Sequence, residues 1–315
     1  MSTLIECFQF HLAAALEGRD FVVMGENVNN GSRISGLGKG LDKLSRVKVL
    51  NVGNCELTHV GAGMGMMLAG GRAVLLVKQL DFMLLGLDQM VNTLNWIRAN
   101  RANRNAPLGS FTIITYLCDQ GFQGPQSSLV DLNGFCSLGG FPGFLLQEES
   151  QLEAVLRHEL SAPGFRIIGI PQRLATQELR RIALSQIDEM NGVRRYGEGT
   201  EIAIVSCHSS FPEALRLSEL LAQAGLHSSI LLSSLVPGAD PARSLRSSPA
   251  PGHIVILDDS KGILKWGDTV ARKCREHLRS AQLHFFERSF PIPFGVQADL
   301  VAWDFTKLLK ELSTP

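Results

Sequence analysis

The densest group of residues able to do chemistry lies in Val52-Gly-Asn-Cys-Glu56 and the twelve or so residues that follow it. A short apolar run precedes this segment and a helical pattern follows, so Glu56 is predicted in the first turn of a helix. The helix dipole stabilises a carboxylate there by about 0.3–1 kcal/mol, and most such glutamates are ordinary surface residues. The alternative is a carboxyl group that shares a proton with a bound ligand.

Small residues recur on the helix that Glu56 begins. Gly61, Gly65 and Ala69 are spaced by four and therefore share one face, which lets another backbone or a flat ligand approach closely. Each glycine costs about 1 kcal/mol relative to alanine in a helix. A dinucleotide-binding turn is not indicated, because Met66 stands where the third glycine of that fingerprint belongs.

A second candidate segment is Gly121-Phe-Gln-Gly-Pro-Gln-Ser-Ser128, which follows an apolar strand ending near Cys118. It is predicted at the carboxyl end of that strand, where open α/β sheets bind ligands, and a plain loop is an equally good interpretation. Ser127 and Ser128 have no GxSxG context, so a serine hydrolase is not expected. The eight histidines are scattered without metal-ligand spacing and are interpreted as structural.

The elements that position these segments alternate between short β-branched runs and longer amphipathic stretches, which is typical of α/β layers with mostly parallel sheets. In the first half, strands are predicted at 21–24, 47–52, 73–77, 111–117, 143–146 and 165–170, and helices at 3–16, 56–69, 82–99 and 151–158. In the second half, strands are predicted at 201–207, 228–232, 253–257 and 283–286, with helices at 212–224 and 269–277 and a short helix and surface loop within 237–251.

The charged segment 172–200 resembles a connector. We therefore predict two domains, 1–171 and 201–315, joined by a linker at 172–200. Each is expected to be a doubly wound, mostly parallel α/β domain.

Composition restricts the class of protein further. The 315 residues are 45% hydrophobic and 19% charged, and 30 Lys and Arg balance 30 Asp and Glu, so nucleic-acid binding through bulk charge is not expected. No apolar run reaches the roughly 18–20 residues that span a bilayer, and no membrane association is expected. The six cysteines are widely spaced without a CxxC pair, which favours reduced thiols in the cytoplasm.

Several segments of the first half occur in a recognisable order. They are Met24-Gly-Glu-Asn-Val28, Gly38-Lys-Gly-Leu41, Val52-Gly-Asn-Cys-Glu56, Asp81-Phe-Met-Leu-Leu-Gly-Leu-Asp-Gln89 and Gly124-Pro125. They resemble the GE-D/N-V, TKGL, VGxxE or PxxE, F-x5-DQ and GP segments of the transketolase-like thiamine diphosphate enzymes. The β subunit of the first component of 2-oxo acid dehydrogenases is the most similar.

The second half resembles the transketolase C-terminal domain, from Glu201-Ile-Ala-Ile-Val-Ser206 to Gly252-His-Ile-Val-Ile-Leu-Asp258. The resemblance covers nearly the whole chain. It implies the thiamine diphosphate-binding fold in a pyrimidine-binding domain, followed by a transketolase C-terminal-like domain.

This resemblance implies roles for particular residues. Glu56 would be catalytic and would bind the cofactor by hydrogen-bonding a ring nitrogen of its aminopyrimidine, and Leu57, Val60 and Met64 are expected to shield that carboxyl group from water. Phe82 and Leu80 would also contact the cofactor, with Phe82 the candidate aromatic ring near the pyrimidine.

Two departures from the family pattern matter. Relatives carry a histidine after the GP pair, whereas this chain has Gln126 and Ser127, which are retained as candidate substrate contacts. The motif for diphosphate and magnesium, GDG followed by Asn-Asn, is missing, and Gly267-Asp268 continues with Thr. No metal site is therefore expected in this chain. The resemblance implies that an α-type partner chain holds the diphosphate and Mg²⁺ while this chain supplies the pyrimidine pocket.

The expected function is a β-type subunit of a split thiamine diphosphate enzyme, active only with its partner in an α2β2 or related assembly. It would cleave a carbon–carbon bond next to a carbonyl and pass on the acyl or ketol unit. A 2-oxo acid dehydrogenase component would hand the acyl group to a lipoyl-carrying protein, whereas a specialised biosynthetic carboligase would add the unit to an aldehyde. A non-catalytic structural subunit of such a complex is the alternative from a different class.

Overall fold

The structure is a computed structural model that describes residues 2–101, 107–118, 132–179, 182–188, 192–247, 249–262, 264–288 and 301–313. The chain divides into two units, Met1–Arg180 and Arg181–Pro315. The boundary falls inside the range 172–200. Each unit contains its own sheet and its own buried core.

The first unit alternates strands with helices. Its elements are α1 (Leu4–Leu16), β1 (Phe21–Gly25), η1 (Leu41–Lys43), β2 (Val47–Asn51), α2 (Glu56–Leu68), β3 (Arg72–Val77), η2 (Leu80–Gly86), η3 (Gln89–Thr93), α3 (Leu94–Arg101), β4 (Ser110–Leu117), α4 (Leu132–Gly139), β5 (Gly143–Leu145), α5 (Glu149–Glu159), β6 (Gly164–Pro171) and α6 (Gln172–Ala175).

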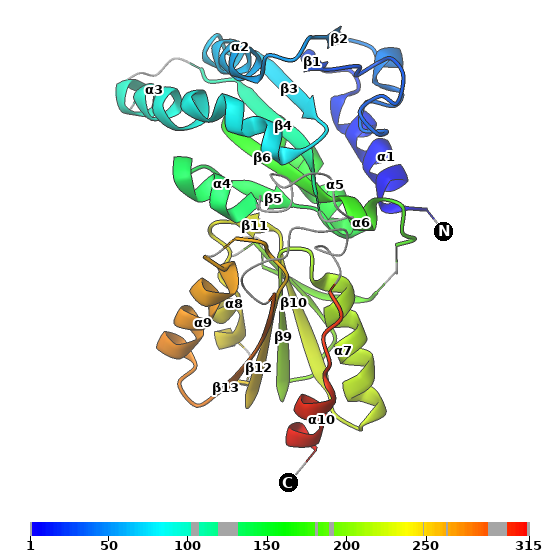
Figure 1. Ribbon diagram of the computed structural model, residues 1–315, viewed down its shortest axis with the longest axis vertical. Helices are drawn as coiled ribbons and strands as arrows, with labels where there is room; N and C mark the ends of the chain where they lie inside the picture. The colour runs from blue at the N-terminus through cyan, green and yellow to red at the C-terminus, as the bar shows by residue number, and fades with distance from the viewer. Residues whose placement is uncertain are drawn as a thin grey trace. The chain divides into compact units, whose positions relative to one another are not determined.

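The strands of this unit form a parallel sheet in the order β5-β6-β4-β3-β1-β2. Helices α1 and α5 cover one face of the sheet, and α2, α3 and α4 lie on the other (Figure 1). Because all these strands run the same way, their carboxyl ends meet at one edge, where the strand-to-helix connections gather.

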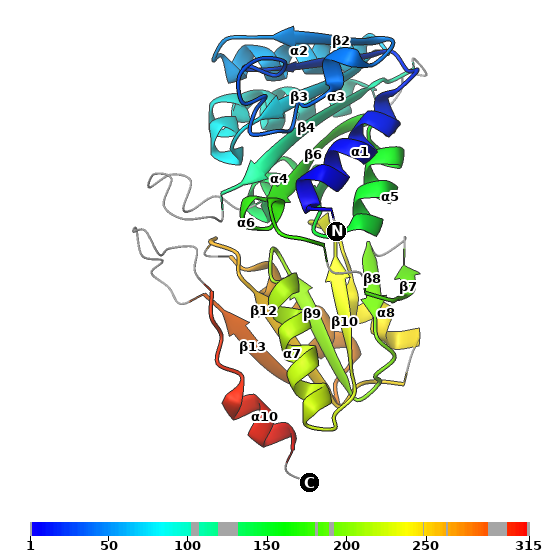
Figure 2. The same cartoon turned by 90° about the vertical axis from the view of Figure 1, so that its right-hand side faces the viewer.

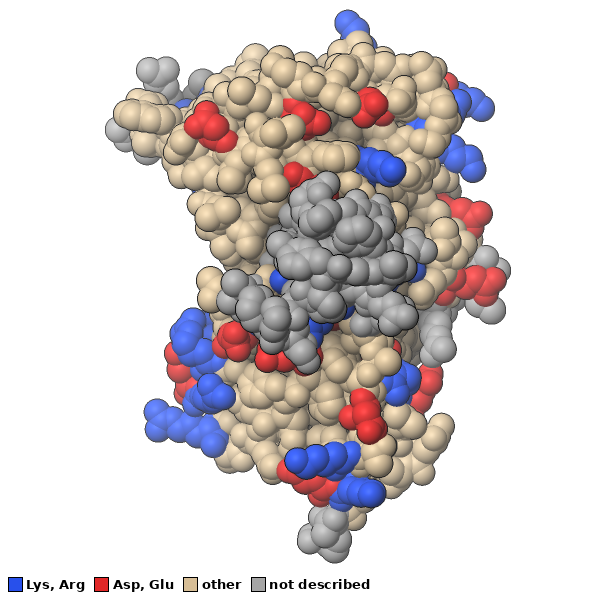
Figure 3. Space-filling view, in the orientation of Figure 1, with Lys and Arg blue, Asp and Glu red and all other residues tan. Residues whose placement is uncertain are grey.

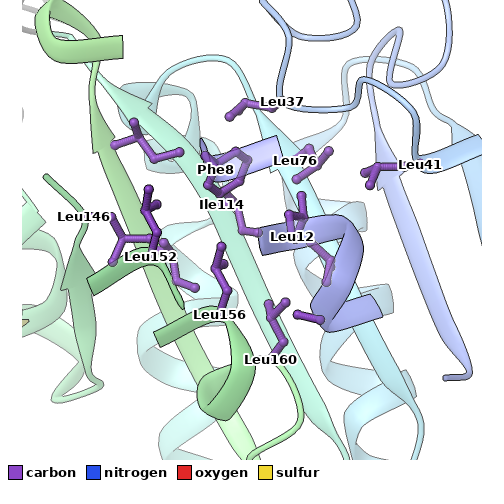
Figure 4. Close-up of a cluster of buried hydrophobic side chains, with 14 of the residues drawn as sticks. Phe8, Leu12, Leu37, Leu41, Leu76, Ile114, Leu146, Leu152, Leu156 and Leu160 are labelled. Atoms are coloured by element: carbon purple, nitrogen blue, oxygen red, sulfur yellow. The ribbon is translucent and has the colours of Figure 1, made fainter. Parts of the chain in front are cut away.

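The core under α1 and α5 follows the helical spacing of apolar residues. Leu4, Phe8 and Leu12 of α1 are fully buried and pack with Leu152 and Leu156 of α5 against the sheet (Figure 4). Truncating one such leucine to alanine typically costs about 2–5 kcal/mol. Helix α1 begins with a capping box between Thr3 and Glu6, in which the Thr3 N–H donates to the Glu6 carboxylate at 2.9 Å.

Helix α2 covers the opposite face and brings its backbone close to the sheet at one glycine. Val60, Met64 and Met67 are buried on its inner side. A Cβ added at Gly63 would lie 2.3 Å from the Phe111 ring of β4, so only glycine fits there.

The second unit contains another α/β layer (Figure 2). Its elements are β7 (Leu184–Asp188), β8 (Val193–Tyr196), β9 (Ile202–Cys207), α7 (Phe211–Gln223), β10 (Ser228–Ser233), β11 (Leu235–Val236), α8 (Pro241–Ser244), η5 (Leu245–Ser247), β12 (His253–Asp258), α9 (Trp266–His277), β13 (Gln282–Glu287) and α10 (Thr306–Leu312). Its sheet has the order β13-β12-β9-β10-β8-β7, parallel through β10 and antiparallel at β8 and β7.

The predicted fold class is confirmed: two α/β units with mostly parallel sheets. The structure contains elements that the sequence does not predict, among them α4, β11 and α10, and it differs from the sequence prediction in two further ranges. The single helix expected at 82–99 is η2, η3 and α3, because close packing of η2 on α2 interrupts the α-helical pattern: a Cβ at Gly86 would lie 2.8 Å from Val60 Cγ2. The range 172–200 contains α6 and the strands β7 and β8, whose antiparallel pairing extends the second sheet.

Within the part of the chain that the structure describes, no helix is both long and apolar enough to cross a bilayer.

Candidate functional site

A cavity of about 370 Å³ opens at the carboxyl ends of β1, β2 and β3 in the first unit. This is the sheet edge at which open α/β folds bind ligands. The cavity has an apolar wall and a polar side. The residues that line it are Gly25, Glu26, Asn27, Ser32, Ile34, Gly53, Asn54, Glu56, His59, Leu75, Leu76, Val77, Lys78, Phe82 and Met83.

Glu56 enters the cavity from the first turn of α2. Strand β2 ends at Asn51, a short turn follows, and Cys55 precedes the helix, with its Sγ within hydrogen-bond distance of Thr58 Oγ1 at 3.0 Å. Glu56 is half-buried, with Val60 and Met64 buried behind it. The expected shielding by Leu57 is wrong: its side chain is on the outer face of α2 and is 45% exposed.

Phe82 supplies an aromatic surface to the same cavity, from a segment distant in the sequence from Glu56. Strand β3 ends at Val77, and η2 begins three residues later, which brings Phe82 and Met83 to the cavity lining. Phe82 is 36% exposed although it is a large apolar residue. An exposed ring beside a cavity can stack on a flat ligand, for about 0.5–1.5 kcal/mol beyond simple burial.

The segment after β1 also lines the cavity, and several of its residues have positive φ angles. A Cβ at Gly25 would lie 2.6 Å from the Leu76 carbonyl oxygen, so glycine is required for β1 to reach the cavity. Arg33, Ile34 and Ser35 have positive φ angles of 50°, 54° and 52°. For a β-branched residue such as Ile34 this conformation costs of order 1–3 kcal/mol, and such strain is often found at ligand sites.

Four ionisable side chains line the cavity: Glu26, Glu56, His59 and Lys78. His59 lies three residues after Glu56 and is half-buried. Burial lowers the pKa of His59, and the nearby Glu56 carboxylate partly offsets this by raising it. The imidazole is therefore biased towards its neutral form, which can accept a proton.

Asp81 is a second unusual carboxyl group, between the cavity residues Lys78 and Phe82 in the chain. Its side chain is buried, and neither carboxylate oxygen has a hydrogen bond to another residue in the described part of the chain. Burial raises the pKa of Asp81. A buried carboxyl without partners is more stable in its neutral form.

The structure brings together two of the residues predicted from the sequence. Glu56 and Phe82 line the same cavity, although 26 positions separate them in the chain. Leu80 is fully buried and is not among the residues that line it. The candidate substrate contacts Gln126 and Ser127, with Gly124-Pro125, lie outside the described residues.

The sequence prediction did not include His59 or Lys78. The scattered histidines of the sequence carry no metal-ligand signal, but the three-residue spacing of His59 from Glu56 places both on one helix face. No sequence pattern marks Lys78 as a cavity residue, because it lines the cavity only by following the end of β3 at Val77. In the described ranges, no three His, Cys, Asp or Glu side chains are close enough together to hold a metal ion.

Comparison with known proteins gives a consistent set of similarities. No family model matches the chain. The chain is 24% identical to the pyruvate dehydrogenase E1 component subunit beta of Leifsonia xyli subsp. xyli (strain CTCB07) over 276 residues, which cover 79% of this chain and 74% of that protein.

Among solved structures, the chain is similar to a split-gene transketolase described as an inactive beta4 tetramer. The TM-score is 0.67 with 15% identity, covering 99% of this chain and 94% of that one. It is also similar to a 2-oxoglutarate:ferredoxin oxidoreductase from Magnetococcus marinus with 2-oxoglutarate, coenzyme A and succinyl-CoA bound. There the TM-score is 0.62 with 11% identity, covering 99% of this chain and 65% of that one. At these identities the likeness establishes the fold.

Proposed function

The chain resembles the β-type subunits of the transketolase-like thiamine diphosphate enzymes, and we propose that it is the subunit that binds the pyrimidine end of the cofactor. The single observation that carries this proposal is that Glu56 and Phe82 line one cavity. A half-buried carboxyl group and an exposed aromatic ring are the two features that an aminopyrimidine needs for hydrogen bonding and stacking.

The residues of the cavity fit such a ring. Its volume, about 370 Å³, lies in the range of small-molecule sites. The wall formed by Leu75, Leu76, Val77 and Met83 is apolar and can cover a flat heterocycle, while Glu56 offers carboxylate oxygens on the other side.

When bound, thiamine diphosphate would supply a nucleophilic ring carbon that attacks a substrate carbonyl. Glu56 would hold a proton at its carboxyl group and share it with a ring nitrogen of the pyrimidine, which orients the ring and sets its protonation state. The apolar wall would exclude water from this shared proton and so strengthen the hydrogen bond.

The substrate would be a 2-oxo acid or a ketol donor, and the acyl or ketol fragment would pass to an acceptor. Sequence similarity to a pyruvate dehydrogenase subunit supports a 2-oxo acid dehydrogenase-like reaction, which would involve a lipoyl-carrying protein. Gln126, at the position where relatives have a histidine, supports a specialised carboligase as the second candidate. Oxidation of a 2-oxo acid by an artificial electron acceptor, assayed beside ketol transfer to an aldehyde, separates the two.

An α-type partner chain would hold the diphosphate and Mg²⁺ in an α2β2 or related cytoplasmic assembly. Exposed apolar residues of the first unit support a partner. Leu57, Leu84, Leu85 and Trp96 are 45%, 49%, 67% and 71% exposed, and Figure 3 shows broad uncharged areas over the first unit, with separate acidic and basic residues among them. Exposed apolar residues grouped on neighbouring elements commonly mark a protein interface.

The test is turnover of the complex reconstituted from this chain and its α-type partner, with Glu56 replaced by Ala. Loss of a proton-sharing group is expected to lower kcat by about 10²- to 10⁴-fold. Asp268→Asn is the matched control, because Asp268 is also an acidic residue in the first turn of a helix but belongs to α9 of the second unit. Unchanged turnover in Glu56→Ala would favour a non-catalytic structural subunit.

A further inference from the structure

His59 is half-buried in the lining of the cavity and does not lie on the open surface of α2. It follows Glu56 by three residues in α2, so the two side chains project from the same face about one turn apart, with Cβ atoms about 5–6 Å from each other. Both line the cavity described above.

The imidazole of His59 is not fixed by other protein groups. Neither ring nitrogen has a hydrogen bond to another residue within the described ranges. Its backbone N–H donates to the Cys55 carbonyl at 3.0 Å, as part of the α2 backbone. A structural histidine is normally held through at least one ring nitrogen, whereas His59 keeps both available to a ligand.

We propose that His59 is a proton-transfer residue of this cavity, acting on the hydroxyl or carbonyl oxygen of a small carbonyl substrate while Glu56 serves the cofactor. This inference rests on the proposed function. An imidazole nitrogen of His59 accepts the proton of a substrate hydroxyl group as that C–O bond becomes a carbonyl and the adjacent C–C bond breaks, its electron pair staying on the other carbon. The imidazolium then returns the same proton to the carbon that keeps this electron pair, so no other reactant is required.

The electrostatics of the cavity suit this role. The charged groups that line the cavity with His59 are Glu26, Glu56 and Lys78, from three different connections of the sheet. Burial lowers the pKa of His59 and the Glu56 carboxylate raises it, so the neutral acceptor form is favoured near neutral pH while the protonated form stays accessible. A group with both forms accessible can accept a proton and return it.

The first test measures His59 directly, by NMR titration of ring-labelled histidine in the full chain without partner or cofactor. We expect the His59 signal to titrate at lower pH than histidine in a short unstructured peptide, because burial lowers the pKa of His59. Replacing Glu56 by Gln should move the His59 titration to still lower pH, because the carboxylate that raises its pKa is removed. A His59 titration that coincides with that of the unstructured peptide and is unchanged by Glu56→Gln would overturn the proposal.

The second test uses the reconstituted complex with thiamine diphosphate, Mg²⁺ and a 2-oxo acid. His59→Asn is expected to lower kcat by about 10²- to 10⁴-fold and to remove the acidic limb of the pH profile of kcat/KM, with cofactor affinity unchanged. His158→Asn is the control and should match the wild type.

The two hypotheses fail in distinguishable ways. Full turnover with an unchanged pH profile in His59→Asn, together with lost turnover in Glu56→Ala, would overturn the role of His59 and leave the proposed function standing. Full turnover in Glu56→Ala would overturn the proposed function itself. Reduced cofactor affinity in His59→Asn with unchanged kcat at saturation would assign His59 to binding and contradict proton transfer.

Discussion

The two units use the carboxyl edge of a parallel sheet in opposite ways. In the first unit, Glu56 and His59 face an open cavity and are only half-buried. In the second, Asp258 and Asp259 at the end of β12 are buried and bonded to backbone. Asp258 accepts from the Ser260 N–H at 2.8 Å and the Gly267 N–H at 2.7 Å.

The second network continues across to β9. Asp259 Oδ1 accepts from the Ser209 N–H at 2.8 Å and lies 3.2 Å from His208 Nδ1, while the Arg288 guanidinium donates to its backbone carbonyl at 2.6 Å. These carboxylates stabilise the connections after their strands. At the carboxyl edge of such a sheet, acidic side chains that are hydrogen-bonded to the protein stabilise the fold, whereas those that face a cavity are available to a ligand.

The largest expected effect on stability comes from breaking the second network. Asp258→Ala leaves the buried Ser260 and Gly267 N–H groups without acceptors and should lower the free energy of unfolding of that unit by about 2–4 kcal/mol. Urea denaturation followed by tryptophan fluorescence in a Trp96→Phe background reports on Trp266 and Trp303 of the second unit.

The companion variant in the first unit is Glu56→Ala. Its stability change should stay within about 1 kcal/mol, the size of a helix-dipole contribution, although its effect on turnover is large. Equal destabilisation by Asp258→Ala and Glu56→Ala would remove the distinction between a structural and a functional edge.

Gly63→Ala tests how tightly α2, the helix that carries Glu56, packs against the sheet. The new methyl group would lie 2.3 Å from the Phe111 ring, so the helix must move away from the sheet. Overpacking of this kind typically costs about 1–3 kcal/mol, and thermal unfolding of the isolated chain measures it. A neutral result would show that α2 is not packed tightly enough to position Glu56.

Gly65→Ala should act in the opposite direction. Among the described residues, no atom outside the adjoining backbone of α2 lies within 4 Å of a Cβ at Gly65, so alanine should stabilise the isolated chain by about 0.5–1 kcal/mol through helix propensity. If the face with Gly61 and Gly65 packs closely against another subunit, the same methyl group should weaken assembly, which calorimetric titration with the α-type chain detects. Unweakened assembly would place the interface elsewhere.

The smallest effect concerns Asp81. Because burial raises its pKa in the folded chain, the native state binds more protons than the unfolded state above the ordinary value of 3.8. Its contribution to stability is complete below pH 3.8 and is lost as pH rises through the raised folded value. Asp81→Asn has no carboxyl group to ionise, so its free energy of unfolding should fall less than that of the wild type as pH rises from 3.8 through the raised pKa. Wild type and variant with parallel pH dependence would contradict the assignment.

Much of the fold could be predicted because buried parallel strands are recorded directly in the sequence as apolar runs. The apolar runs predict strands at 111–117 and 253–257, and the structure has β4 at Ser110–Leu117 and β12 at His253–Asp258. Local spacing also placed Glu56 at a helix start, where the structure has it.

Other features depend on contacts between distant segments and could not be predicted in this way. The break in the helix expected at 82–99 follows from the approach of Gly86 to Val60, and β8 forms by pairing with β10 about 35 residues later in the chain. The cavity itself combines the ends of three strands, so Lys78 and His59 became candidates only when those strands were seen side by side.

The most direct test of the central claim is a crystal structure of the complex reconstituted from this chain and its α-type partner with thiamine diphosphate and Mg²⁺. The account predicts a Glu56 carboxylate oxygen within hydrogen-bond distance of an aminopyrimidine ring nitrogen, with Phe82 against the ring. A Glu56 side chain directed into bulk solvent, away from the cofactor, would contradict it.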